Sequence, residues 1–141
     1  MLYLLLTYLF VFAEPGQGYA TPQLSHSDSG LTLYVFTGSD WCANCRRFDR
    51  KVLHDSAFIT AMKGKHIRIE ILDFPQRKKL SAETVAYNQA MSEKLGFKNI
   101  FPTVVLYSSS GTGKQKTLYY RNEAGAEFSA MVLNELGHLN E

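Results

Sequence analysis

The sequence predicts an α/β domain in which a mixed central β-sheet carries helices on both faces. Buried strands and amphipathic helices alternate along the chain, and a hairpin and one more helix follow them. The chain has 141 residues and 45% hydrophobic content, enough for one core and short for two. Both cysteines stand together as Cys42-Ala43-Asn44-Cys45, directly after the first strand. We therefore expect one compact domain built around this motif.

The N-terminal segment, residues 1–13, is an uncharged apolar block. A helix needs about 20 residues to span a bilayer, so the block has instead the length of a signal-peptide core. Small residues suit cleavage by signal peptidase after Ala13 or Ala20. The positively charged start of a typical signal peptide is missing, because no Lys or Arg precedes Arg46. A buried N-terminal strand is the alternative. The expected organisation is a signal peptide (1–20), a lead-in rich in Gly, Pro, Ser and Thr (21–30) and one folded domain (31–141).

The folded domain begins with an apolar run over 31–36, which predicts a buried strand. Apolar residues at helical spacing then predict a helix from Cys42 to about residue 54. A second short helix is expected over 56–63, with Gly64 as its stop.

The second half of the domain continues the alternation. Polar and apolar residues alternate over 66–73, which predicts a strand. A helix is expected over 81–95, because capping residues begin it at Ser81 and Gly96 follows it. Two β-type runs around a Ser- and Gly-rich turn predict a hairpin, and apolar residues at helical spacing predict a last helix. This order gives a mixed sheet flanked by helices.

The charge pattern argues against a nucleic-acid partner. The formal net charge is +2, and the basic residues are scattered apart from Arg77-Lys78-Lys79. That triplet reads as part of a solvated polar loop.

The Cys-x-x-Cys motif is the feature that predicts chemistry. It opens a helix, and the unpaired N–H groups and positive dipole end there favour a thiolate over a thiol. Cys42 is therefore the expected nucleophile, and Cys45, one turn along the same face, is the expected resolving thiol. No other cysteine is left for a structural staple. No histidine has a second close-spaced ligand, so no metal site is expected.

Trp41-Cys-x-x-Cys45, together with Phe101-Pro102-Thr103 ahead of a strand, resembles the thioredoxin family over about residues 31–137. The stretch 39–49 is most similar to secreted or periplasmic members, such as the C-terminal domain of the membrane thiol transporter DsbD and small thioredoxin-like reductases. The resemblance implies a thioredoxin fold, a redox-active Cys42–Cys45 disulfide and no other cofactor. It also implies that Trp41, Phe101 and a cis Pro102 contact the substrate. The alternative for Pro102 is simply to begin a strand.

Three departures from familiar thioredoxins change the expected chemistry. Phe36 stands where cytosolic thioredoxins carry a buried aspartate, so Cys45 must lose its proton to water, to Glu70 if it lies nearby, or to the substrate. Ala43-Asn44 replaces the familiar Gly-Pro, and basic residues follow Cys45. The reduction potential of the Cys42/Cys45 couple should therefore be less negative than that of thioredoxin, which is about −270 mV. Asp40 is interpreted as a helix-capping acid, with a modest negative influence on Cys42 as the alternative.

The implied function is that of a periplasmic or secreted thiol:disulfide oxidoreductase, a reductase of protein disulfides served by a membrane thiol-redox partner. The reductive direction is favoured because the chain lacks the large inserted helical domain typical of dedicated oxidases. Three alternatives stay open: a disulfide oxidase or isomerase, a redox-inactive thioredoxin-like binding module or chaperone, and a metal-handling protein that uses the cysteine pair.

The first prediction concerns processing. Because the apolar block stops there, the mature protein should begin after Ala13 or Ala20. Intact-mass spectrometry of protein recovered from an exporting host checks the new N-terminus. A soluble cytoplasmic protein that retains Met1 would contradict the secretion hypothesis.

Overall fold

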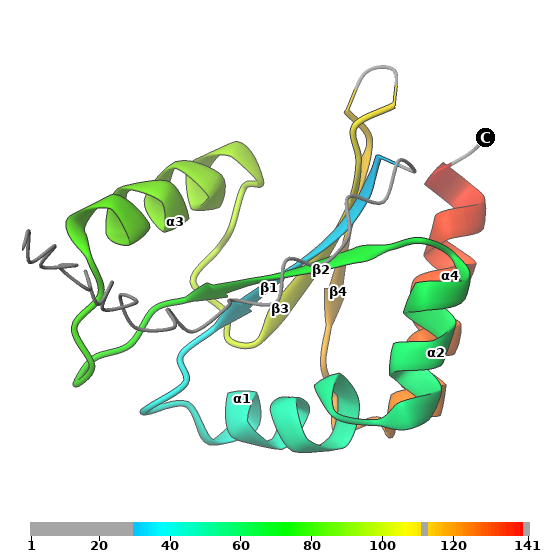
Figure 1. The fold of residues 1–141 in the computed structure, drawn as a ribbon, viewed down its shortest axis with the longest axis horizontal. Helices are drawn as coiled ribbons and strands as arrows, with labels where there is room; N and C mark the ends of the chain where they lie inside the picture. Colours follow the sequence, from blue (N-terminus) through cyan, green and yellow to red (C-terminus); the bar gives the residue numbers. More distant parts are fainter. Residues whose placement is uncertain (1–29, 111–112, 140–141) are drawn as a thin grey trace, which may run out of the picture.

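The computed structural model describes residues 30–110 and 113–139 (Figure 1). The signal peptide and nearly all of the lead-in expected from the sequence lie outside these residues. The elements, in chain order, are β1 (Leu31–Thr37), α1 (Ala43–Phe48), the π-helical segment η1 (Asp49–Leu53), α2 (Ser56–Gly64), β2 (Arg68–Asp73), α3 (Ala82–Lys94), β3 (Thr103–Ser108), β4 (Gln115–Tyr119) and α4 (Gly125–Leu139).

The strands form one four-stranded sheet in the order β2-β1-β3-β4. β1 runs parallel to β2, with Thr37 opposite Asp73 at the end of the pairing, and antiparallel to β3. β4 is antiparallel to β3, as expected for a hairpin. The mixed sheet predicted from the sequence is therefore confirmed.

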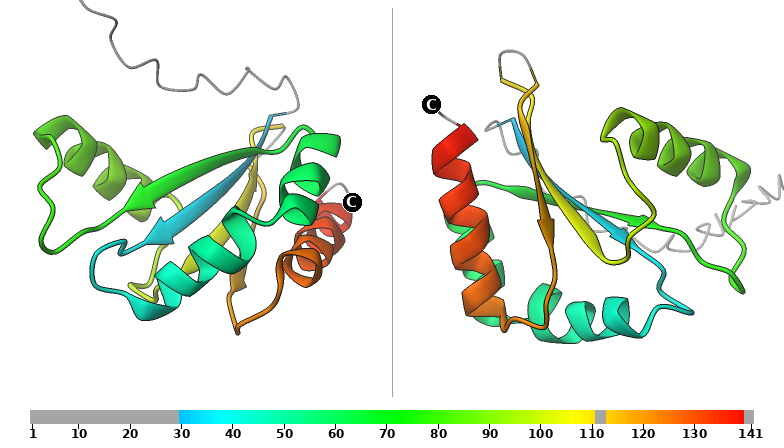
Figure 2. Two further views of the ribbon diagram at one scale, coloured as in Figure 1. Left: turned by 60° about the horizontal axis from the view of Figure 1, so that its bottom comes forward. Right: turned by 180° about the vertical axis from the view of Figure 1, so that it is seen from behind.

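Helices cover both faces of this sheet (Figure 2). α3 lies alone on one face, whereas α1, η1, α2 and α4 lie on the other, where α4 packs against α2, η1, β3 and β4. The α/β class with helices on both faces is confirmed. None of the helices within the described ranges is both long and apolar enough to cross a membrane.

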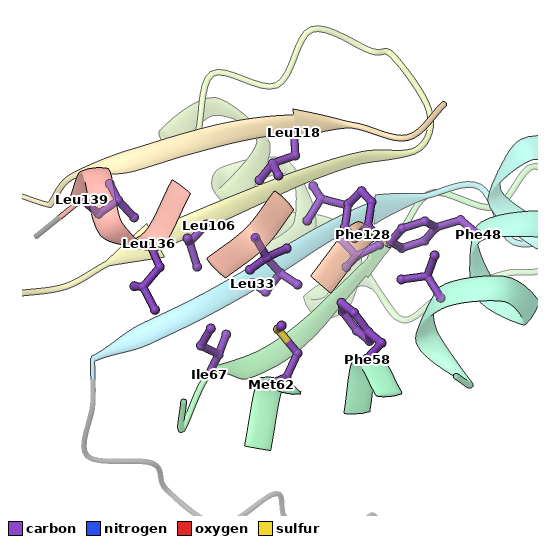
Figure 3. Close-up of a cluster of buried hydrophobic side chains, with 14 residues drawn as sticks. Leu33, Phe48, Phe58, Met62, Ile67, Leu106, Leu118, Phe128, Leu136 and Leu139 are labelled. Carbon is purple, nitrogen blue, oxygen red and sulfur yellow. The ribbon is translucent and has the colours of Figure 1, made fainter. Parts of the chain in front are cut away.

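The larger core lies between the sheet and the helical layer of α1, η1, α2 and α4 (Figure 3). Because successive strand residues point to opposite faces, Leu33 and Val35 of β1 both point into it. Three phenylalanines fill its centre, and the Phe128 ring lies 5.1 Å from that of Phe48 and 6.2 Å from that of Phe58. α1, α2 and α4 are therefore joined through Phe128.

The smaller core lies under α3. Tyr34 and Phe36, the alternate residues of β1, meet Met91 and Leu95 of α3 there. Phe36 is fully buried. The two cores share β1, so this strand fixes how both helical layers sit relative to the cysteine motif.

Several boundaries differ from the prediction. The helix expected from Cys42 to about residue 54 is α-helical only as far as Phe48 and continues as one π-helical segment. α2 ends at Gly64, the expected stop, but Gly64 is itself the last helical residue, and the left-handed residue that follows is His66, with φ 54°. Gly96, at φ 63°, ends α3 as predicted.

Truncating Phe128 tests the junction of the helices. Phe128→Ala should lower the free energy of unfolding by about 3–5 kcal/mol, because the lost ring leaves a cavity among Phe48, Phe58 and Tyr120. Urea unfolding followed by far-UV circular dichroism measures the change. Asn134→Ala, on the exposed side of the same helix, is the control and should stay within about 0.5 kcal/mol. Equal midpoints for the two variants would contradict this account of the core.

Candidate active site

The cysteine motif is held at the end of β1 by a tight backbone turn. The Gly38 carbonyl accepts hydrogen bonds from the Trp41 amide at 3.3 Å and from the Cys42 amide at 2.9 Å. Cys42 has an extended backbone and is the N-cap of α1, so its side chain stands at the start of the helix. Cys42 and Cys45 form a disulfide with a Cα–Cα separation of 5.2 Å.

Each sulfur of the motif receives a backbone N–H. Cys45 N lies 3.1 Å from Cys42 Sγ, and Gly38 N lies 3.5 Å from Cys45 Sγ. Hydrogen bonds of this kind favour the thiolate when the disulfide is reduced. Cys42 exposes 7% of its surface and Cys45 2%, so the residue at the helix start is the more exposed of the two.

Positive charge follows the second cysteine directly. Arg46 and Arg47 are both exposed in the last turn of α1. Arg47 Nη1 donates a hydrogen bond to Asn44 Oδ1 at 2.9 Å, which holds the guanidinium beside Asn44, one of the two residues between the cysteines. Cations this close to a thiol stabilise its ionised form.

The structure brings together the residues expected to contact the substrate. The rings of Trp41 and Phe101 meet edge to face with centroids 5.2 Å apart, so the loop that ends in Pro102 lies beside the cysteine motif. The Phe101–Pro102 peptide bond is cis, and Pro102 is buried at the start of β3. Trp41 and Phe101 are each only partly buried.

Sequence reasoning missed the aromatic cluster behind this pair. Phe97 lies 5.0 Å from Phe101 and 4.2 Å from Phe36, measured between ring centroids, and Phe74 lies 5.9 Å from Phe101. The Trp41 indole also donates to the Phe74 carbonyl at 2.8 Å. The position that holds a carboxylate in cytosolic thioredoxins is therefore filled by stacked aromatic rings on the α3 side of the sheet.

Glu70 does not lie at Cys45. It pairs with Tyr34, which faces the smaller core, and its carboxylate accepts from the Tyr87 hydroxyl and lies 2.9 Å from Arg68 Nη2. Burial, and then the hydrogen bond to Glu70, raise the pKa of Tyr87 to about 12, so this tyrosine remains a donor at neutral pH. As a proton acceptor for Cys45, Glu70 is the wrong residue, because it faces the opposite side of the sheet.

A cavity of about 190 Å³ opens beside Cys45 on the other face of β1 and β2. Its lining includes Asp49 and Asp73, the carboxylates that share this space with the sulfur. Asp73 also fixes the turn, since its two oxygens accept from Ser39 N at 2.9 Å and from Ser39 Oγ at 2.7 Å. Sequence reasoning missed Asp73, because its place depends on the strand register that sets it opposite Thr37.

Asp40 does not cap α1, so that interpretation is wrong. Its carboxylate accepts hydrogen bonds from the backbone amides of Gln76, Arg77 and Lys78, at 2.9, 2.7 and 2.8 Å. These bonds, that of Gln76 first, hold the pKa of Asp40 below its usual value. Asp40 therefore anchors the loop after β2 to the turn that carries the cysteines, and Cys42 itself is the N-cap.

No group of three or more His, Cys, Asp or Glu side chains within 30–110 and 113–139 is placed to hold a metal ion.

The curated proteins that this chain resembles include two that carry Dsb names. No family model matches the chain. It is 32% identical over 90 residues to the disulfide bond reductase DsbH of Chlamydia pneumoniae, covering 62% of this chain and 53% of that protein. It is 27% identical over 110 residues to the thioredoxin-related protein DsbJ of the same organism, covering 77% of this chain and 30% of DsbJ. The chain thus spans about half the length of one of these relatives and less than a third of the other.

Solved structures agree with the sequence relatives. A structure titled DsbH oxidoreductase superimposes with a TM-score of 0.70 and 28% identity, over 78% of this chain and 74% of that one. A thioredoxin from Thermus thermophilus superimposes with a TM-score of 0.53 over 79% of each chain, and at 16% identity it supports the fold alone. The thioredoxin fold expected from the sequence is confirmed.

Substituting Gly38 tests how tightly the turn is packed. A Cβ at this position would lie 2.4 Å from Cε2 of Trp41, so Gly38→Ala should displace the indole and break its bond to the Phe74 carbonyl. Because Trp41 is the chain's one tryptophan, its fluorescence emission should shift, and reactivity at Cys42 should fall. Gly64→Ala, with no heavy atom within 4 Å of the new Cβ, is the control and should leave the emission unchanged. An unchanged spectrum in Gly38→Ala would contradict the packing.

Proposed function

We propose that this chain, a thioredoxin-like protein of the Dsb type, acts as a thiol:disulfide oxidoreductase that reduces protein disulfides in the periplasm or another secreted compartment. The observation that carries the proposal is the Cys42–Cys45 pair at the start of α1, with a backbone N–H on each sulfur. Similarity to a Chlamydia protein named as a disulfide bond reductase supports the reductive direction.

The reaction uses the two sulfurs in turn. In the reduced protein, the Cys42 thiolate attacks one sulfur of a substrate disulfide; a new S–S bond forms, and the electron pair of the broken bond leaves on the other substrate sulfur. Cys45 thiolate then attacks Cys42 Sγ and releases the second substrate thiol. Two electrons pass to the substrate, and the protein is left with the disulfide seen in this structure.

Cys45 must lose its proton before it can attack. With Phe36 in the small core and Glu70 on the far face, water in the cavity beside Cys45 is the proposed acceptor. The cavity, at about 190 Å³, has room for several waters at about 30 Å³ each. Asp49 and Asp73 line the same space and are placed to stabilise the hydronium that forms.

Trp41, Phe101 and Pro102 form the proposed docking surface for the substrate polypeptide. Trp41 and Phe101 are in contact and partly exposed, and they join the cysteine turn to the start of β3. Flat aromatic faces of this kind bury substantial area at low entropic cost. The substrate in the mixed disulfide with Cys42 would therefore pack against the Trp41 and Phe101 rings while Cys45 attacks that disulfide.

Regeneration requires a donor of two electrons. We assign this role to a membrane thiol-redox partner, on the expectation that residues 1–20 direct the chain out of the cytoplasm. Reduction of insulin by the protein, together with the equilibrium potential of the Cys42/Cys45 couple against glutathione, tests the direction. A potential near that of strong oxidants, about −120 mV, would replace the reductase with an oxidase or isomerase.

The asymmetry of the two cysteines gives the central prediction. Cys45→Ala should accumulate mixed disulfides with substrates, because no second thiol resolves them, whereas Cys42→Ala should trap none. Non-reducing electrophoresis followed by mass spectrometry counts the trapped species. In the reduced wild type, alkylation should label Cys42 first, with an apparent pKa below about 8.5.

Equal labelling of both thiols, with no partner captured by Cys45→Ala and no insulin reduction by the wild type, would instead support a binding module whose cysteines are incidental. The double variant Cys42→Ala/Cys45→Ala is the matched control, because it keeps the fold and removes both sulfurs.

A further inference from the structure

A second pocket lies on the opposite side of the cysteine motif from the cavity at Cys45. It has a volume of about 240 Å³ and is formed between α1 and the segment that follows β4. Its lining residues are Asn44, Arg47, Tyr120, Arg121 and Asn122. Figure 2 shows the segment after β4 running down to the helix formed by α1 and η1, which is how residues far apart in sequence come to share this pocket.

The pocket is positively charged. Arg47 and Arg121 line it, and Lys51 Nζ lies 3.3 Å from Asn122 Oδ1 at its edge. Arg50 also acts electrostatically on Tyr120. The opposing acid is Glu123, whose carboxylate already accepts a hydrogen bond from the Arg121 amide at 2.6 Å.

Hydrogen-bond donors are available as well as charge. The Tyr120 hydroxyl is buried and has no hydrogen-bond partner among the described residues. Its ring is held edge to face against Phe48, with centroids 5.1 Å apart, so its position is fixed by the core. Arg47 gives one N–H to Asn44, and a guanidinium carries five.

We propose that this pocket is a subsite for a carboxylate of the substrate, an Asp or Glu side chain close in sequence to the cysteine under attack. The proposal rests on the oxidoreductase function proposed above. Asn44 lies between Cys42 and Cys45 and also lines the pocket, so a polypeptide joined to Cys42 passes within a few residues of it. A carboxylate is the anion that polypeptides carry, and the arginine fork matches its two oxygens.

Paired substrates test the subsite in the full-length protein. Two peptides with the same disulfide are compared, one with Asp or Glu beside the cysteine and one with Asn or Gln. At low salt the wild type should reduce the acidic peptide with a kcat/KM about fivefold higher, the effect expected of a favourable surface ion pair. Raising the ionic strength should shrink this preference.

Arg121 is the residue to vary, because it charges the pocket without belonging to the cysteine helix. Arg121→Gln should abolish the acidic preference, and Arg121→Glu should reverse it in favour of a peptide with Lys beside the cysteine. Lys65→Glu is the matched control, since it makes the same charge change on an exposed residue between α2 and β2, and the preference should persist.

The outcomes separate the two proposals. If the wild type reduces both peptides equally well, the subsite is overturned and the oxidoreductase function stands. If the wild type reduces neither peptide, the proposed oxidoreductase function itself is contradicted. Oxidised glutathione, a small disulfide that also carries carboxylates, is the third substrate: dependence on Arg121 for glutathione but not for the peptides would overturn a polypeptide subsite. The salt series on the wild type keeps the test decisive even if a variant does not fold.

Discussion

The pairing of β1 with β2 is the constraint on which the site depends. It ends with Thr37 opposite Asp73, and the Phe74 amide then donates to the Thr37 carbonyl at 2.8 Å. From that point the chain after β2 holds the turn after β1: Asp73 binds Ser39, and the Phe74 carbonyl accepts from Trp41. The cysteines are therefore positioned by a neighbouring loop as much as by their own helix.

Periodicity and turn chemistry in the sequence were sufficient to predict the order of elements, the mixed sheet and the redox-active motif. They could not supply strand register, and register decides which acid meets Cys45. Glu70 and Asp73 are both acids of β2, but they lie three positions apart along the strand, so they face opposite sides of the sheet. The role of Asp40 escapes the sequence for a related reason: an acid just before a helix can cap it or bind a distant loop, and only the folded chain brings residues 76–78 to its carboxylate.

Phe36 shows how one substitution rearranges the surroundings of a site. Where a buried carboxylate would require charge compensation, this chain packs a ring against Phe97 and Phe74, which is favourable without any partner charge. The ionisable groups near Cys45 consequently lie in a cavity on the other face of the sheet. Burial of charge at this position is thereby avoided, and under the proposed function proton exchange at Cys45 depends on solvent access to that cavity.

The three backbone amides on Asp40 determine how the cysteine turn responds to acid. A carboxyl whose pKa is lowered by folding contributes stability above its unfolded pKa of 3.8 and loses it only as the pH falls through the lower folded value. The hydrogen bonds between Asp40 and the loop after β2 therefore persist until the pH falls below the usual pKa of an aspartate. The turn that carries Cys42 and Cys45 thus stays fastened to that loop at a pH at which an ordinary aspartate begins to lose its charge.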